Sequence, residues 1–234
     1  MKALLYKEFK LAMHPICYLF VALFPLMILI PSYPIAVGFI YVLASYPILF
    51  LGANKGQQSH DLLYSVLLPV RKKDIVLARI ITVVTMQLAS ILIMSALYPA
   101  SLAINTAIAQ SVEAQKAAGE AVKAPGIPGL GLNSYVLILA IAIIGYSIAD
   151  LIFLPIYYKK GKWIVMPTLL TILSFITYLG ITTIALPYIP GLEILNNLTI
   201  GIQFIALAVA ILISVLVHIL VYKISSSRLE KVDF

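Results

Sequence analysis

Long apolar segments separated by short polar ones run through the whole chain. A membrane-spanning helix needs about 20 consecutive, mostly apolar residues. The pattern predicts six such helices, at about residues 15–30, 35–53, 75–103, 135–157, 164–186 and 200–222. The first two belong to one uncharged run, which is divided by a Pro-Ser-Tyr-Pro sequence at residues 31–34 that is typical of a tight turn. We therefore expect an all-α integral membrane protein with a single transmembrane domain over residues 1–234.

Residues 1–14 have a different pattern. At helical spacing Lys7, Lys10 and His14 share one face, and apolar side chains between Leu5 and Met13 share another. This amphipathic pattern predicts a helix that lies in the membrane interface before the first span.

Composition agrees with a membrane protein. Of the 234 residues 62% are hydrophobic and 11% are charged, against roughly 25% charged in an average soluble domain. The sequence contains one cysteine, Cys17, so an intrachain disulfide is excluded. Since no Cys/His cluster has metal-ligand spacing, we predict no metal site.

The positive charges predict the orientation. The chain has 16 lysines and arginines. All but Lys116 and Lys123 lie in four segments: the N-terminal helix, residues 54–79, the loop after residue 157 and the C-terminal tail. Basic loops stay in the cytoplasm, so both termini are expected there and residues 104–134 are expected to form an extracellular hairpin. The net charge of +7 is thus a topology signal, and we expect no nucleic-acid partner.

Asp150 is the ionisable residue that lies well inside a predicted span. Such residues are costly in a bilayer and are candidates for a substrate or proton path. Two alternatives are a hydrogen bond to a neighbouring helix and a wet vestibule near the cytoplasmic side. His218, near the cytoplasmic end of the last span, is interpreted as an interfacial or packed histidine.

The sequence lacks motifs for catalysis. It has no G-x-x-x-x-G-K-[ST] phosphate loop, no H-E-x-x-H and no G-x-S-x-G. We therefore predict that the chain is not an enzyme and does not hydrolyse ATP itself.

Residues 54–74 form a polar segment between the second and third predicted spans. Ser59 is a favourable N-cap, Asp61 suits the first turn, and an apolar stripe follows before Pro69. The segment is predicted to be a short amphipathic helix. It could rest on lipid headgroups, with Arg71, Lys72 and Lys73 as anchors, or it could dock a cytoplasmic partner.

Two stretches resemble the permeases of type-2 ABC exporters. The run from Leu62 to Arg79, LLYSVLLPVRKKDIVLAR, is similar to the cytoplasmic loop between the second and third membrane helices of that family. The opening Leu5-Tyr6-Lys7-Glu8-Phe9 looks like the start of the family's interfacial helix.

This resemblance implies a partner-driven transporter. Two permease chains, as a homodimer or a heterodimer, would form the path in a bacterial plasma membrane and would contact membrane lipid. Two separate ABC ATPase subunits would carry ATP and magnesium, and no cofactor would bind this chain. The coupling helix that contacts the ATPase would comprise Ser59, His60, Asp61, Leu62, Leu63, Tyr64, Val66 and Leu67. Further cytoplasmic interface residues would be Lys7, Glu8, Lys10, Arg71 and Lys72.

The expected cargo is an amphipathic peptide, since small permeases of this build resemble exporters of such peptides, including phenol-soluble modulins. Lipid-linked sugars and drugs are the alternatives. A secondary transporter or channel without an ATPase, in which Asp150 would act, and a membrane scaffold are the rival classes.

Overall fold

A computed structural model of the chain describes residues 2–12, 15–30, 37–51, 70–117, 130–160, 164–190, 192, 195 and 198–231. All regular elements of this described part are helices, which confirms the predicted all-α class. In chain order they are α1 (Lys2–Lys7), a π-helix (Glu8–Ala12), α2 (Pro15–Leu23), a 3₁₀ helix (Phe24–Leu29), α3 (Val37–Leu51), α5 (Lys72–Ala117), a 3₁₀ helix (Leu132–Ser134), α6 (Tyr135–Lys160), α7 (Val165–Leu179), a π-helix (Gly180–Ala185), a 3₁₀ helix (Leu186–Tyr188) and α8 (Ile200–Glu230).

Four helical segments are long and apolar enough to cross a membrane: Lys72–Ala117, Leu132–Lys159, Val165–Ala185 and Ile200–Glu230. A fifth span results if Lys2–Lys10 and Pro15–Leu29, which meet at 79°, are counted together. The described helices thus support four or five spans and do not confirm six. The reason is that α3 has only 15 residues, short of the about 20 that a span needs.

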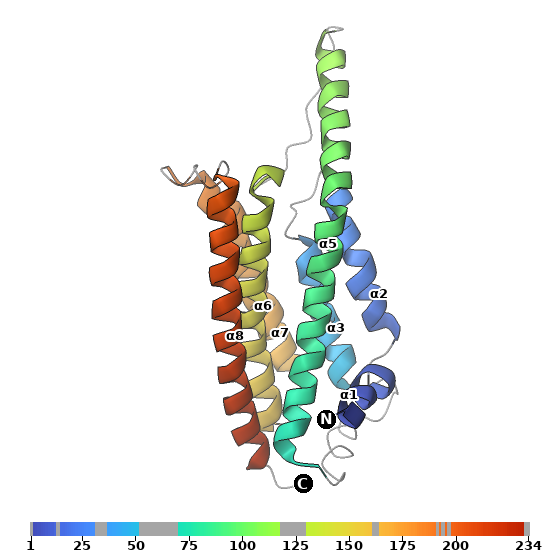
Figure 1. The fold of residues 1–234 in the computed structure, drawn as a ribbon, viewed down its shortest axis with the longest axis vertical. Coiled ribbons are helices and arrows are strands. Elements are labelled where there is room, and N and C mark those ends of the chain that lie inside the picture. Colours follow the sequence, from blue (N-terminus) through green and yellow to red (C-terminus); the bar gives the residue numbers. More distant parts are fainter. Residues whose placement is uncertain are drawn as a thin grey trace.

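The third predicted helix extends past its expected end near residue 103. α5 runs on to Ala117, so the helix continues into residues 104–117, the first part of the predicted extracellular hairpin. Their sequence is rich in Ala, Gln, Glu and Lys, which are strong helix formers. Figure 1 shows this end of α5 rising beyond the other helices.

α6 lies at the centre of the bundle and packs against α7 and α8. Aromatic side chains fill the space around it. Tyr146 stacks on Phe175 of α7 with 5.2 Å between the ring centroids, and Phe153 meets Tyr46 of α3 edge-on with 5.3 Å between the ring centroids. Gly145 permits this close approach, since a Cβ there would lie 2.7 Å from the Phe175 ring. The core therefore includes an aromatic contact between α3, α6 and α7, beside apolar residues of α2, α5 and α8.

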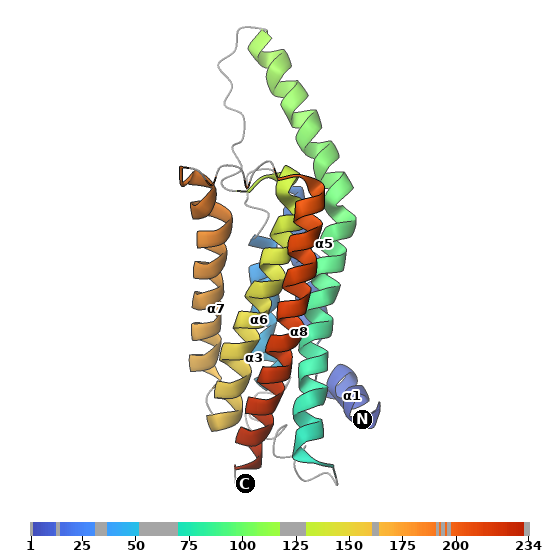
Figure 2. The same cartoon turned by 60° about the vertical axis from the view of Figure 1, so that its left-hand side comes forward.

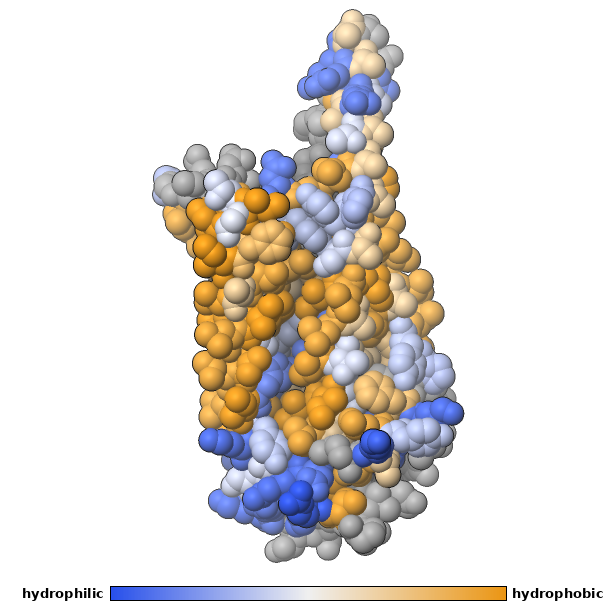
Figure 3. All heavy atoms as spheres, in the orientation of Figure 1, coloured by the Kyte–Doolittle hydropathy of each residue, from blue (hydrophilic) through white to orange (hydrophobic). Residues whose placement is uncertain are grey.

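The outside of the bundle is apolar over a broad band (Figure 3). Only 11% of the most apolar stretch of α8 is buried, and large side chains such as Leu212 and Leu216 are 62% and 59% exposed. Hydrophilic residues gather at the lower end of the molecule and on the projecting end of α5 (Figure 3). This distribution suits a helix bundle surrounded by lipid.

Candidate functional site

The Asp150 carboxylate is fully buried and accepts hydrogen bonds from three other helices. The hydroxyl of Tyr46 in α3 donates to Oδ1 at 2.5 Å. The amide of Gln87 in α5 donates to Oδ2 at 2.8 Å and also lies 2.5 Å from the Tyr46 hydroxyl. His218 in α8 completes the set, with Nε2 3.0 Å from Oδ2. We call these four residues the Asp150 cluster.

His218 is held from both sides. Its Nδ1 lies 2.7 Å from the backbone oxygen of Ser214. That oxygen can only accept, so Nδ1 must donate. The Nε2 of His218 faces the Asp150 carboxylate at 3.0 Å. Hydrogen-bond partners of this kind lower the cost of placing a polar group inside a bilayer.

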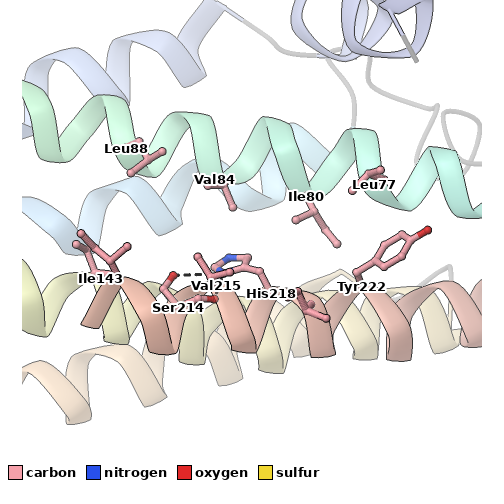
Figure 4. A pocket seen from close by; sticks show the side chains of 11 residues that line it. Leu77, Ile80, Val84, Leu88, Ile143, Ser214, Val215, His218 and Tyr222 are labelled. Carbon is pink, nitrogen blue, oxygen red and sulfur yellow. Dashed lines mark hydrogen bonds between the residues drawn. The ribbon is translucent and has the colours of Figure 1, made fainter. Parts of the chain in front are cut away.

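A groove of about 410 Å³ opens between α5 and α8 beside the cluster. Figure 4 shows Leu77, Ile80, Val84 and Leu88 along its α5 wall, opposite the α8 residues. Ser214 and His218 are the polar residues at its floor, apart from the Tyr222 hydroxyl at one end. In Figure 3 hydrophilic atoms are visible in the hollow between these helices. The cluster thus borders an apolar groove that faces outward.

A second buried ion pair joins the N-terminal segment to α5. Nε of Arg79 lies 2.6 Å from Oε2 of Glu8, and Nη2 of Arg79 donates to Oε1 at 3.4 Å. Both side chains are at most 5% exposed, and the ammonium of Lys7 lies 3.6 Å from the same carboxylate. Glu8 and Arg79 therefore fix the N-terminal helix to the start of α5.

The start of α5 also meets the end of α8. Lys73 forms a salt bridge of 3.3 Å with Glu230, and Lys72 lies 3.5 Å from the backbone oxygen of the same residue. Arg71 pairs with Asp74 at 3.0 Å, and this hydrogen bond raises the pKa of Arg71 from its ordinary value. α1 and the C-terminal end of α8 both lie at this end (Figures 1 and 2). We call it the basic end.

The predicted site residues divide into two groups. All the predicted coupling-helix residues, from Ser59 to Leu67, lie outside the described part of the chain. Of the predicted interface residues, Arg71 and Lys72 lie at the start of α5. Lys7, Glu8 and Lys10 lie in the N-terminal segment that Glu8 ties to Arg79, and Lys7 and Glu8 are buried.

Sequence reasoning singled out Asp150 and His218, the latter as an interfacial or packed histidine, but did not pair them. Gln87, a polar residue in the middle of an apolar segment, is a further partner that the sequence could have marked. Tyr46 carries no such signal. Among the described residues, no group of three His, Cys, Asp or Glu side chains could hold a metal ion.

The family described as ABC-2 family transporter protein matches residues 3–116. This stretch includes the N-terminal helix, the predicted coupling segment and nearly all of α5. No curated protein and no solved structure matches the chain. The apolar helices and the basic end fit the membrane component of such a transporter. Residues 3–116, just under half of the chain, match the ABC-2 transporter family, and this match supports a type-2 ABC permease.

Proposed function

We propose that this chain is the transmembrane subunit of an ATP-driven exporter, paired with a second permease chain and driven by two separate ABC ATPase subunits. The observation that carries the proposal is the family match over residues 3–116, which spans the predicted coupling segment. In this proposal six spans cross the plasma membrane of a bacterium, the N-terminal helix lies in the interface, and the basic end is cytoplasmic.

The contacts of α5 support a transmission path for force. α5 begins at Lys72, directly after the segment proposed to dock on the ATPase. Seven residues further on, Arg79 is tied to Glu8 in the N-terminal helix. A movement of the docking segment would therefore displace α5 and the N-terminal helix together, because separating Glu8 from Arg79 would break a buried ion pair.

The Asp150 cluster would carry that movement into the bundle. Its four residues belong to α3, α5, α6 and α8. Tyr46, Gln87 and Asp150 are at most 4% exposed, and the His218 side chain is 15% exposed towards the groove. We therefore assign Asp150 a role in holding these helices together, in preference to direct contact with cargo in the translocation path.

The ATPase partnership is tested by isolating the tagged permease from its native membrane and identifying co-purified proteins. We expect a stoichiometric phosphate-loop ATPase, and we expect Leu63→Asp and Asp61→Lys to lose it while membrane insertion stays normal. Lys116→Gln, at the opposite end of α5, is the matched control. Purification without any ATPase would instead favour a secondary transporter, a channel or a scaffold.

The cargo proposed is an amphipathic peptide, since the spans that face the bilayer carry few charges. The test uses the permease and its ATPase reconstituted together in vesicles. Amphipathic helical peptides should stimulate ATP hydrolysis and accumulate on the far side, whereas a lipid-linked sugar or a hydrophobic drug should not. Stimulation by the sugar or the drug alone would replace the peptide assignment without removing the exporter.

A further inference from the structure

We propose that the groove between α5 and α8 binds one acyl chain of an anionic phospholipid, whose headgroup lies against Lys73 and Lys223. The proposal is independent of ATPase coupling, because it rests on the groove and the charges at its mouth. It assigns the groove to a lipid of the leaflet at the basic end.

The walls of the groove have the chemistry of an acyl-chain site. Leu77, Ile80, Val84 and Leu88 recur at helical spacing and form one stripe on α5. The facing wall of α8 is supplied by Ile211, Val215 and Ile219. Leu88, Val215 and Ile219 are each about half exposed, at 50%, 52% and 49%, so a bound chain would cover apolar surface on both helices.

The length of the groove matches one leaflet. Its α5 wall extends from Leu77 to Leu88, which is about 16 Å at 1.5 Å per residue. The hydrocarbon core of a bilayer is roughly 30 Å thick. The groove therefore reaches from the basic end to about the middle of the membrane, as a chain rooted in that leaflet does.

Positive charges stand at the mouth of the groove. Lys73 lies one turn before Leu77 on α5, and the exposed Lys223 lies one turn after Ile219 on α8, so each continues a groove wall. Lys73 remains 53% exposed although it pairs with Glu230. Lysines at this depth attract anionic headgroups. This charge complementarity favours an anionic lipid over a zwitterionic one.

A lipid in the groove would also stabilise the bundle, because the floor of the groove contacts the Asp150 cluster. The His218 side chain is 15% exposed, and its Nε2 contacts the buried Asp150 carboxylate. Because His218 lines the groove, a chain lying there would exclude water from the pair. Bound lipid should therefore raise the thermal stability of the whole bundle.

The test measures lipid binding to the delipidated full-length chain by native mass spectrometry, with phosphatidylglycerol and phosphatidylcholine of identical acyl chains as probes. Phosphatidylglycerol should bind more tightly and raise the melting temperature. Val84→Phe and Ile219→Phe, which fill the groove from opposite walls, should each reduce phosphatidylglycerol binding at least about fivefold. Leu92→Phe and Leu216→Phe, exposed residues of the same helices outside the groove lining, should bind as the parent does.

Charge variants test the headgroup assignment. Lys73→Gln and Lys223→Gln should each weaken phosphatidylglycerol binding about fivefold and leave phosphatidylcholine binding unchanged. Lys116→Gln is the control at the far end of α5. Gel filtration identifies misfolded variants. The two groove-filling variants are on different helices, so the groove assignment can be tested with either one if the other does not fold.

Three outcomes would overturn the proposal. The first is equal binding of the two lipids. The second is unchanged binding in the folded filling variants. The third is a groove that binds the two lipids without preference and from which an amphipathic peptide displaces the bound lipid. That result would make the groove a cargo site. No ATPase is present in these measurements, so a failure of the lipid proposal leaves the exporter proposal intact. A failure of the exporter proposal likewise leaves the lipid proposal intact.

Discussion

Nε2 of His218 in α8 lies 3.0 Å from Oδ2 of Asp150 in α6, although 68 residues separate them in the chain. The same carboxylate accepts from Tyr46, 104 residues before it, and from Gln87, 63 residues before it. Four helices are thus joined through one side chain. In a bundle whose helices face apolar lipid, such polar contacts fix which helices pack together.

Energetic coupling between Asp150 and His218 is the first prediction. Asp150→Asn and His218→Gln should each lower the free energy of unfolding. The double variant should lose less than the sum of the two single losses, with a coupling energy of about 1–3 kcal/mol. The measurement is reversible denaturation in detergent. Thr85→Ala is the control, since the exposed Thr85 hydroxyl donates to the backbone oxygen of Ile81 within α5. Additive single effects would show that the pair contributes no interaction energy.

Transport by Asp150→Asn is the second prediction. If Asp150 acts by holding helices together, the amide, which preserves shape and accepts hydrogen bonds, should retain most transport under conditions in which the protein stays folded. Peptide export in vesicles measures this. Complete loss of transport at normal expression and normal melting temperature would instead place Asp150 in the translocation path.

The third prediction concerns the Glu8–Arg79 pair. Glu8→Ala should cost about 3 kcal/mol or more, because it leaves the buried Arg79 guanidinium without its carboxylate. Lys10→Gln should cost less than about 1 kcal/mol, because it removes only an exposed contact with the Tyr6 ring. Chemical denaturation in detergent measures both. The charge swap Glu8→Arg combined with Arg79→Glu should recover part of the lost stability. Equal costs for Glu8→Ala and Lys10→Gln would contradict a stabilising role of the buried Glu8–Arg79 pair.

The fourth prediction concerns the contact between α6 and α7. Gly145→Ala would place a Cβ 2.7 Å from Phe175 and 3.2 Å from Tyr178, so we expect a loss of about 1–3 kcal/mol from overpacking. A second substitution, Phe175→Leu, should restore part of it. Gly201→Ala is the control, since nothing lies within 4 Å of the added carbon there. Equal stability of the two alanine variants would show that α6 and α7 do not pack this closely.

Orientation is the fifth prediction. In a Cys17→Ser background, Lys116→Cys on the projecting end of α5 should react with a membrane-impermeant maleimide added to intact cells. Lys73→Cys at the basic end should react only after the membrane is opened. The opposite labelling pattern would reverse the proposed topology.

The class and the approximate places of the helices could be predicted from the sequence. Whether a segment prefers lipid or water depends on its own composition, so the apolar segments that became α5, α6, α7 and α8 were recognisable along the chain. Helix ends were less well determined. α5 passes the predicted boundary and continues through helix-forming residues to Ala117, because leaving the apolar layer does not itself terminate a helix.

The sequence by itself determined that this chain is a helical membrane protein and that Asp150 is an exceptional residue, and it predicted that the basic segments lie at one end. Each of these follows from the kind and order of residues. Only the tertiary structure decided that Asp150 meets His218, that Glu8 meets Arg79, and that Leu77 and Ile219 face one another across a groove. Those pairings depend on how each helix is rotated about its axis and which neighbours it packs against. In a bundle that is apolar on nearly every face, the pattern along one helix does not specify that rotation.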